Sequence, residues 1–87
     1  MAIKLNPDYA EAYCNRGVVF SNLQKIAEAL SDFNKAIELQ PDFARTYYFK
    51  GMLEFDTGKK DAACDDIQKA SGLGYQNAID SYNKLCR

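Results

Sequence analysis

The sequence predicts an all-α protein built from short antiparallel helix pairs that recur along the chain. The only two prolines, Pro7 and Pro41, stand 34 residues apart, and many other positions repeat at the same offset. A period of this length is typical of helical repeat proteins. Between the turn signals, apolar residues recur at the spacing of three and four that indicates amphipathic helices. Charges of both signs are scattered rather than blocked, which is typical of solvated helix faces.

The 34-residue offset relates residues of the same size. It pairs Tyr13 with Tyr47, Gly17 with Gly51, Ala29 with Ala63, Phe33 with Ile67 and Ala36 with Ala70. Small residues at repeated positions let two helices approach closely, and the bulky members of the set fill the remaining space. A substitution that enlarges one of the two glycines is therefore expected to overpack the helix pair.

Five helices are expected in order. The first covers residues 9–20, and after a polar break at 22–25 the second covers residues 26–37 and is ended by Pro41, which cannot continue a helix. The third covers 43–55 and, after a break at 56–58, the fourth covers 60–70. Gly58 and Gly72 are expected at helix ends, because glycine tolerates a left-handed backbone. The fifth covers 75–86, with one apolar and one polar face, as a helix that caps the stack must have.

These residues resemble the signature of the tetratricopeptide repeat (TPR) family. The first repeat supplies Tyr13, Gly17, Phe20, Ala29, Phe33, Ala36 and Pro41, and the second supplies Tyr47, Gly51, Ala63, Ile67 and Ala70. The resemblance implies helix-turn-helix repeats stacked in a right-handed superhelix, here one domain over residues 1–87. Residues 1–9 would be the tail of a preceding repeat, 10–43 repeat one, 44–77 repeat two and 75–87 a capping helix. Glu54, Cys64 and Tyr75 depart from the family pattern, which indicates an atypical terminal repeat.

Composition excludes several function classes. Eleven Lys and Arg against twelve Asp and Glu give a net charge of −1, so no broad electrostatic attraction to nucleic acid or anionic membrane is expected. No apolar run is long enough to span a bilayer, and the opening residues lack the apolar core of a signal peptide. The chain has no histidine, which removes the commonest general base and metal ligand. The sequence therefore predicts a protein that is not an enzyme and needs no cofactor or metal.

Three cysteines, Cys14, Cys64 and Cys86, are spread along the chain. An odd number without a regular framework argues against a disulfide-built secreted fold, so a reducing, cytoplasmic location is expected. Their wide separation argues against a zinc site. Cys64 occupies a core position and is interpreted as a small apolar filler. Cys86, near the C-terminus, is expected to oxidise between chains.

The resemblance implies a module for protein–protein interaction, in which the first helix of each pair lines a concave groove. By position, the candidate peptide-binding residues are Glu11, Asn15, Val18, Asn22, Arg45, Tyr48, Met52, Phe55 and Tyr82. Tyr48, Met52 and Phe55 form an apolar stripe, which predicts an apolar or aromatic peptide ligand. The alternative for Tyr48 and Met52 is that they pack under the last helix. The basic clamp that chaperone-binding members use is absent, because its positions hold Cys14, Val18, Tyr48 and Met52.

Two functions remain open at this stage. The chain either docks a protein or peptide partner in the groove, or is a structural or self-associating section of a longer solenoid without a ligand. Residues 2–7 align with residues 36–41 at the repeat offset, so the chain is expected to be a piece of a longer TPR protein. Apolar surface at its front would then invite self-association, as a homodimer or by exchange of helices.

Overall fold

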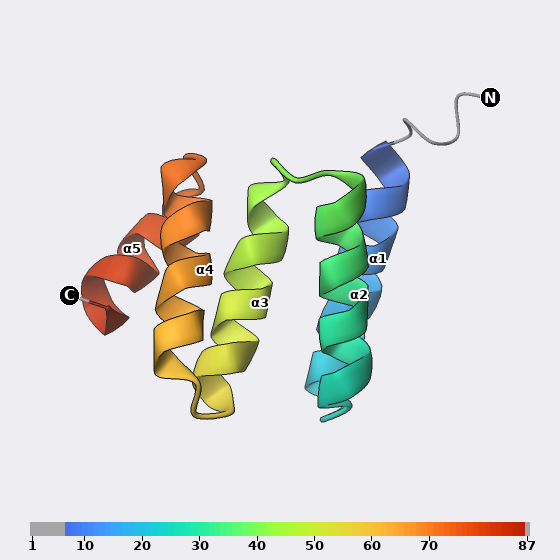
Figure 1. Ribbon diagram of the computed structural model, residues 1–87, viewed down its shortest axis with the longest axis horizontal. Coiled ribbons are helices and arrows are strands. Elements are labelled where there is room, and N and C mark those ends of the chain that lie inside the picture. The colour runs from blue at the N-terminus through green and yellow to red at the C-terminus, as the bar shows by residue number, and fades with distance from the viewer. Residues whose placement is uncertain (1–6, 87) are drawn as a thin grey trace. The chain divides into compact units, whose positions relative to one another are not determined.

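A computed structural model describes residues 7–86 of the chain, and the side chains of residues 9–86. It contains five helices, and these residues include no strand: α1 (Pro7–Asn22), α2 (Ile26–Leu39), α3 (Ala44–Asp56), α4 (Lys60–Gly72) and α5 (Gln76–Leu85) (Figure 1). The predicted all-α class and its succession of helices are confirmed. The expected similarity of residues 2–6 to the end of a repeat lies outside the described residues.

The chain divides into two compact units, the first ending at Phe43 and the second beginning at Ala44. In the first unit α1 packs against α2, and in the second α3 packs against α4 and α4 against α5. Each helix runs back along its predecessor in the same unit, because only a short turn separates them (Figure 1). Each unit is therefore built on helix pairs of the kind that the sequence predicts.

The first unit is held together by the close approach of Gly17 on α1 to Phe33 on α2. A Cβ atom added to Gly17 would lie 2.7 Å from Cε1 of Phe33, much closer than two carbon atoms can pack. Phe33 is fully buried, as are Ala29 and Ala36 on the same helix. The predicted role of the small residues, which is to let a large ring fill the space between the helices, is confirmed.

The second unit repeats this arrangement with different side chains. A Cβ atom on Gly51 would lie 2.7 Å from Cγ1 of Ile67 and 3.0 Å from the backbone oxygen of Ala63. Ile67 belongs to a buried cluster with Ala70 on α4 and Ala78 on α5, here called the α4–α5 core. This core therefore joins the last helix to the pair before it.

Left-handed residues stand in the turns between the helices. Gln24 has a φ of +64° between α1 and α2, and Gly58 has +87° at the position 34 residues later. Gly58 thus occupies a helix-ending turn as predicted. Gly72 is the last residue of α4, but the left-handed residue is Gly74, with a φ of +92°. The reason is that the helix continues through Gly72, so the chain reverses only where the Gly74 N–H donates to the Ser71 oxygen at 2.9 Å.

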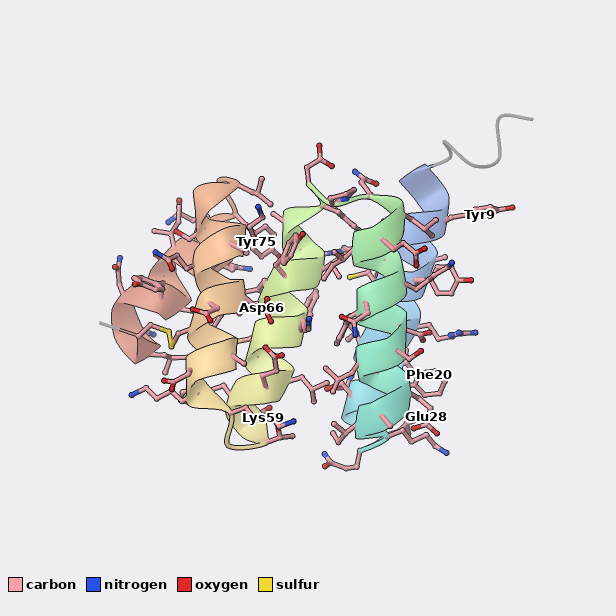
Figure 2. The ribbon with its side chains drawn as sticks, viewed as in Figure 1. Tyr9, Phe20, Glu28, Lys59, Asp66 and Tyr75 are labelled. Atoms are coloured by element: carbon pink, nitrogen blue, oxygen red, sulfur yellow. A yellow bond between two sulfur atoms is a disulfide. The ribbon has the colours of Figure 1, made fainter. Side chains whose placement is uncertain are left out.

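Cys64 on α4 and Cys86 after α5 form a disulfide, with their Cα atoms 5.7 Å apart (Figure 2). The interpretations of Cys64 as a core filler and of Cys86 as a thiol that pairs between chains are therefore wrong. The two cysteines stand at equal distances in sequence from Tyr75, so a helix that turns back along α4 brings them side by side. Cys14 is the free cysteine, and it is buried.

Candidate functional site

The nine predicted peptide-binding residues fall into two sets, one in each unit. On α1, Glu11, Asn15 and Asn22 are exposed and Val18 is partly buried. Their spacing of three and four residues places them along one side of the helix. Cys14, which stands at a clamp position of the family and beside this stripe, is completely buried. The α1 set is therefore a polar strip of surface, with Val18 as its apolar member.

In the second unit, Tyr48 and Met52 on α3 and Tyr82 on α5 come together against the α4–α5 core. Tyr75, just before α5, joins them, with its ring centroid 5.3 Å from that of Tyr48. Such tilted ring pairs are favourable beyond the area that they bury. We call Tyr48, Met52, Tyr75 and Tyr82 the aromatic patch. All four side chains are only partly buried, so the patch contributes both to the core and to the surface.

The other two predicted residues of this unit lie near the two ends of α3. Arg45 lies in the first turn of α3 and Phe55 in its last turn, and both are partly buried. Phe55 is not among the side chains that pack against the α4–α5 core. Sequence spacing thus places Tyr48, Met52 and Phe55 on one stripe, whereas the structure gathers only the first two with Tyr75 and Tyr82.

A pair of carboxyl groups connects α3 and α4 in the same unit. Burial of Glu54, together with a hydrogen bond to Asp66 and the charge of Asp66, raises the pKa of Glu54 to about 7, against the opposing charges of Lys50 and Lys59. Asp66 lies on the α4 side of the pair (Figure 2), and Lys50 Nζ lies 3.9 Å from its Oδ2. The hydrogen bond needs a proton on one of the two carboxyl groups. Glu54 therefore keeps its proton close to neutral pH in the folded chain.

An arginine links the two helices of the first unit. The Arg16 guanidinium donates two hydrogen bonds to Asp32, at 2.7 and 2.8 Å, and these bonds and the Asp32 charge raise the pKa of Arg16. Its centre lies 5.6 Å from the ring centroids of both Tyr13 and Phe20. Because the Asp32 side chain is only 6% exposed, the guanidinium neutralises a carboxylate that would otherwise be buried without a partner.

Two open pockets in the first unit involve none of the predicted peptide-binding residues. One, of about 280 Å³, is lined by α1 residues around Tyr13 and Arg16, and Tyr9 at its edge projects away from the helix (Figure 2). The other, of about 550 Å³, is lined by α2 residues between Ala27 and Glu38, among which Leu30 is the large apolar side chain. Both lie on a single helix and are open, so neither supplies the converging polar groups of an enclosed ligand site.

Comparison with protein families decides what these helix pairs are. Models of the tetratricopeptide repeat match residues 10–43 and residues 44–73. The chain belongs to the tetratricopeptide repeat family. Neither the curated proteins nor the solved structures gave a significant match. TPR repeats are in general non-catalytic protein–protein interaction modules.

Two features are absent from the part of the TPR chain that the structure describes. In that part, no helix is both long and apolar enough to cross a membrane. Within the same residues, no three side chains of Cys, Asp or Glu gather where they would hold a metal ion.

Proposed function

We propose that the TPR chain binds a partner protein through the aromatic patch, which takes up apolar or aromatic side chains of a peptide segment. The observation that carries the proposal is the gathering of Tyr48, Met52, Tyr75 and Tyr82 at a partly exposed surface. Aromatic residues and methionine are enriched at protein interfaces. Tyrosine offers a large contact area at a small entropic cost, and methionine adapts its shape to the partner. Membership of the TPR family also supports a protein-binding function, since TPR repeats generally bind proteins.

The chemistry of the patch defines the ligand that it suits. Three tyrosines combine an apolar ring with a hydroxyl group, so they bury apolar surface and still satisfy polar groups of a peptide backbone. Met52 has a flexible thioether, which adapts its shape to different side chains. A helical or extended segment with apolar residues at regular spacing fits this combination. The polar strip on α1, formed by Glu11, Asn15, Val18 and Asn22, is proposed as a second contact surface for the same kind of partner, with Arg45 and Phe55 as further contacts on α3.

The test is capture of partners by the tagged full chain, with identification by mass spectrometry. Tyr48→Ala and Met52→Ala should each reduce the recovery of a genuine partner by about tenfold or more, as truncation of an interface anchor does. Tyr9→Ala is the matched control, because Tyr9 is an aromatic residue of the other unit and is 43% exposed. Recovery of every partner by both patch variants would refute the proposal.

Because Tyr48 and Met52 also pack against the α4–α5 core, loss of binding has to be separated from loss of folding. Circular dichroism of each variant gives its helix content at the capture temperature. Met52→Leu adds a second check, because it preserves most of the apolar volume and is expected to leave the core intact. A patch variant that keeps its helices and loses the partner supports the binding role.

The second candidate is a structural or self-associating scaffold without a ligand. It is favoured by exposed apolar side chains in the first unit: Tyr9, Val19 and Leu23 are 43%, 54% and 59% exposed. Apolar surface of this kind is often covered by another protein. Light scattering over a wide concentration range tests it, with Val19→Lys as the variant that should shift a dimer to monomer. A monomer at every concentration would remove the homodimer.

The cytoplasmic location that the sequence favours is retained only as a proposal. Its argument from cysteine usage no longer holds, because Cys64 and Cys86 are paired. A disulfide in a cytosolic protein is usually transient or regulatory, whereas one in a secreted protein is usually permanent. Fractionation of cells that express the untagged protein would decide between them.

A further inference from the structure

The disulfide lies at the far end of α5, where it has the greatest effect on that helix. α5 is ten residues long, and isolated helices of this length are marginal in water. At its start it is attached through the turn at residues 73–75, and at its end Cys86 is bonded to Cys64 of α4. Ala78 is its only fully buried residue. The position of α5 therefore depends on modest packing and on the cross-link.

The same helix and the turn before it supply two members of the aromatic patch. Tyr75, which precedes α5, has its ring against Tyr48. Tyr82 and Cys86 pack on the α4–α5 core together with Tyr48 and Met52. Movement of the C-terminal end of α5 away from α4 would withdraw Tyr82 and Cys86 from this core. The surface of α3 that carries Tyr48 and Met52 would then become more accessible.

We propose that Cys64 and Cys86 form a reversible thiol–disulfide site that controls access to Tyr48 and Met52. As regulation of binding, this rests on the function proposed above for the aromatic patch. The oxidised chain holds α5 against α4 and restricts access to Tyr48 and Met52. The reduced chain releases the end of α5 and with it Tyr82, so that a partner side chain can take the place of Tyr82 beside Tyr48 and Met52. Both cysteines are partly exposed, so small thiols can reach them, whereas Cys14 is fully buried.

The co-reactant belongs to the class of low-molecular-weight thiols, of which glutathione is the probe. A glutathione thiolate attacks one sulfur of the disulfide, the Cys64–Cys86 bond breaks, and the departing cysteine thiolate takes up a proton. A second glutathione thiolate attacks the mixed disulfide and releases the other cysteine. Two glutathione molecules thus supply two electrons, and the products are two protein thiols and glutathione disulfide. Oxidation by glutathione disulfide is the reverse sequence.

The first experiment measures the redox state and the opening of α5 in the full chain. The protein is equilibrated in glutathione buffers that span the poise of the cytosol and of the endoplasmic reticulum. Alkylation of the denatured protein should add one group to the oxidised chain, at Cys14, and three to the reduced chain, which has three cysteines. A disulfide that stays intact at the most reducing poise would overturn the proposal.

Hydrogen exchange of the same samples reports the freedom of the helix. Reduction should speed amide exchange in α5 by on the order of 100-fold, the effect expected from removal of a cross-link that closes a loop of this length. Amides of α1 and α2 provide the internal control, since the disulfide does not involve the first unit. Equal exchange in α5 of the two forms would show that the disulfide does not hold the helix, and would refute the switch.

The second experiment measures access to the patch without a ligand, from the rate at which hydrogen peroxide converts Met52 to its sulfoxide. The disulfide-bonded chain is compared with Cys64→Ser/Cys86→Ser, and Cys14→Ser is the control that keeps the disulfide. The double variant should react several-fold faster at Met52, and the control at the rate of the wild type. Equal rates in all three chains would refute the proposed gating.

The outcomes separate this inference from the function on which it rests. In one outcome Met52 reacts faster in the double variant, but Tyr48→Ala and Met52→Ala leave partner capture unchanged. This result would support the redox site and reject the patch as the binding surface. In the other outcome partner capture is lost in Tyr48→Ala and Met52→Ala but is the same in the oxidised and reduced chains. This result would support the patch as the binding surface and reject its control by the disulfide. If the double variant loses its helices, exchange in the reduced wild-type chain decides the question alone.

Discussion

Replacement of Gly51 by alanine tests the close helix approach on which the second unit depends. The added Cβ atom would stand 2.7 Å from Cγ1 of Ile67 and 3.0 Å from the backbone oxygen of Ala63. Ile67 is fully buried, so it has little room to move, and the Ala63 oxygen belongs to the backbone of α4. Because neither atom can move away easily, the cost lies in the upper part of the range for overpacking, at about 2–3 kcal/mol. Alanine recovers about 1 kcal/mol as the better helix former.

The net expectation for Gly51→Ala is a loss of about 1–2 kcal/mol in the free energy of unfolding. In a domain of this size the melting temperature should then fall by about 5–15 °C. Thermal unfolding followed by circular dichroism measures this shift, with the disulfide kept oxidised in every sample. Gly51→Leu, which adds more volume at the same place, should lower the midpoint further.

Gly72→Ala is the matched control, because Gly72 also lies in a helix but no atom lies within 4 Å of its added Cβ. It is expected to leave the midpoint unchanged or to raise it by the helix-propensity gain of up to about 1 kcal/mol. A Gly51→Ala chain that melts at or above the wild-type temperature would show that α3 and α4 approach less closely than the 2.7 Å contact with Ile67 requires.

Two further predictions concern buried charge. Arg16→Gln should lower the free energy of unfolding in urea, because Asp32, whose side chain is 6% exposed, loses the partner that compensates its burial. Lys35→Gln, at an exposed ion pair, should change it by less than about 0.5 kcal/mol. Equal effects of the two substitutions would contradict the assigned role of Arg16. Since folding raises the pKa of Glu54 from 4.5 to about 7, the stabilisation from its proton is complete below pH 4.5 and is lost as the pH rises through 7. Glu54→Gln should remove this pH dependence. At pH 8 its free energy of unfolding should exceed that of the wild type by about 1–2 kcal/mol, after allowance for solvent screening. Urea unfolding at each pH measures both chains, and the control Glu38→Gln should follow the wild-type curve.

Most of the fold could be predicted from the sequence, because it depends on residue size at repeated positions. A glycine facing a large side chain occurs in both helix pairs, as Gly17 with Phe33 and as Gly51 with Ile67. Such a pairing is visible as a repeat of small and large residues, and it requires no knowledge of the exact helix orientation. The turn after α4 was harder to predict, since Gly72 and Gly74 are both candidates and only the helix length decides between them.

The candidate site could be predicted only in part. Spacing along α3 placed Tyr48 and Met52 on the same side, but their meeting with Tyr82 and Tyr75 depends on how α5 turns back along α4. That angle is set by packing of the α4–α5 core rather than by local pattern. For the same reason Phe55, on the predicted stripe, lies outside the gathered residues.

The interactions that sequence reasoning missed begin at the positions that depart from the family pattern. Glu54 replaces an aromatic residue and pairs with Asp66. Cys64 stands where leucine is common and bonds to Cys86, and Tyr75 replaces the closing proline and packs on Tyr48. We interpreted these departures as marks of a terminal repeat. The signal for the disulfide was present, since its two cysteines lie on apolar helix faces at equal distances from the turn, but proximity of side chains follows only once the helices are placed.

The proton that Glu54 holds also has a consequence for the heat of unfolding. Between pH 4.5 and about 7, the folded chain carries this proton and the unfolded chain does not. Melting in that interval therefore delivers close to one hydrogen ion to the buffer, which absorbs it with its own enthalpy of ionisation. Calorimetric enthalpies measured in two buffers at the same pH should consequently disagree, and their difference counts the ions released.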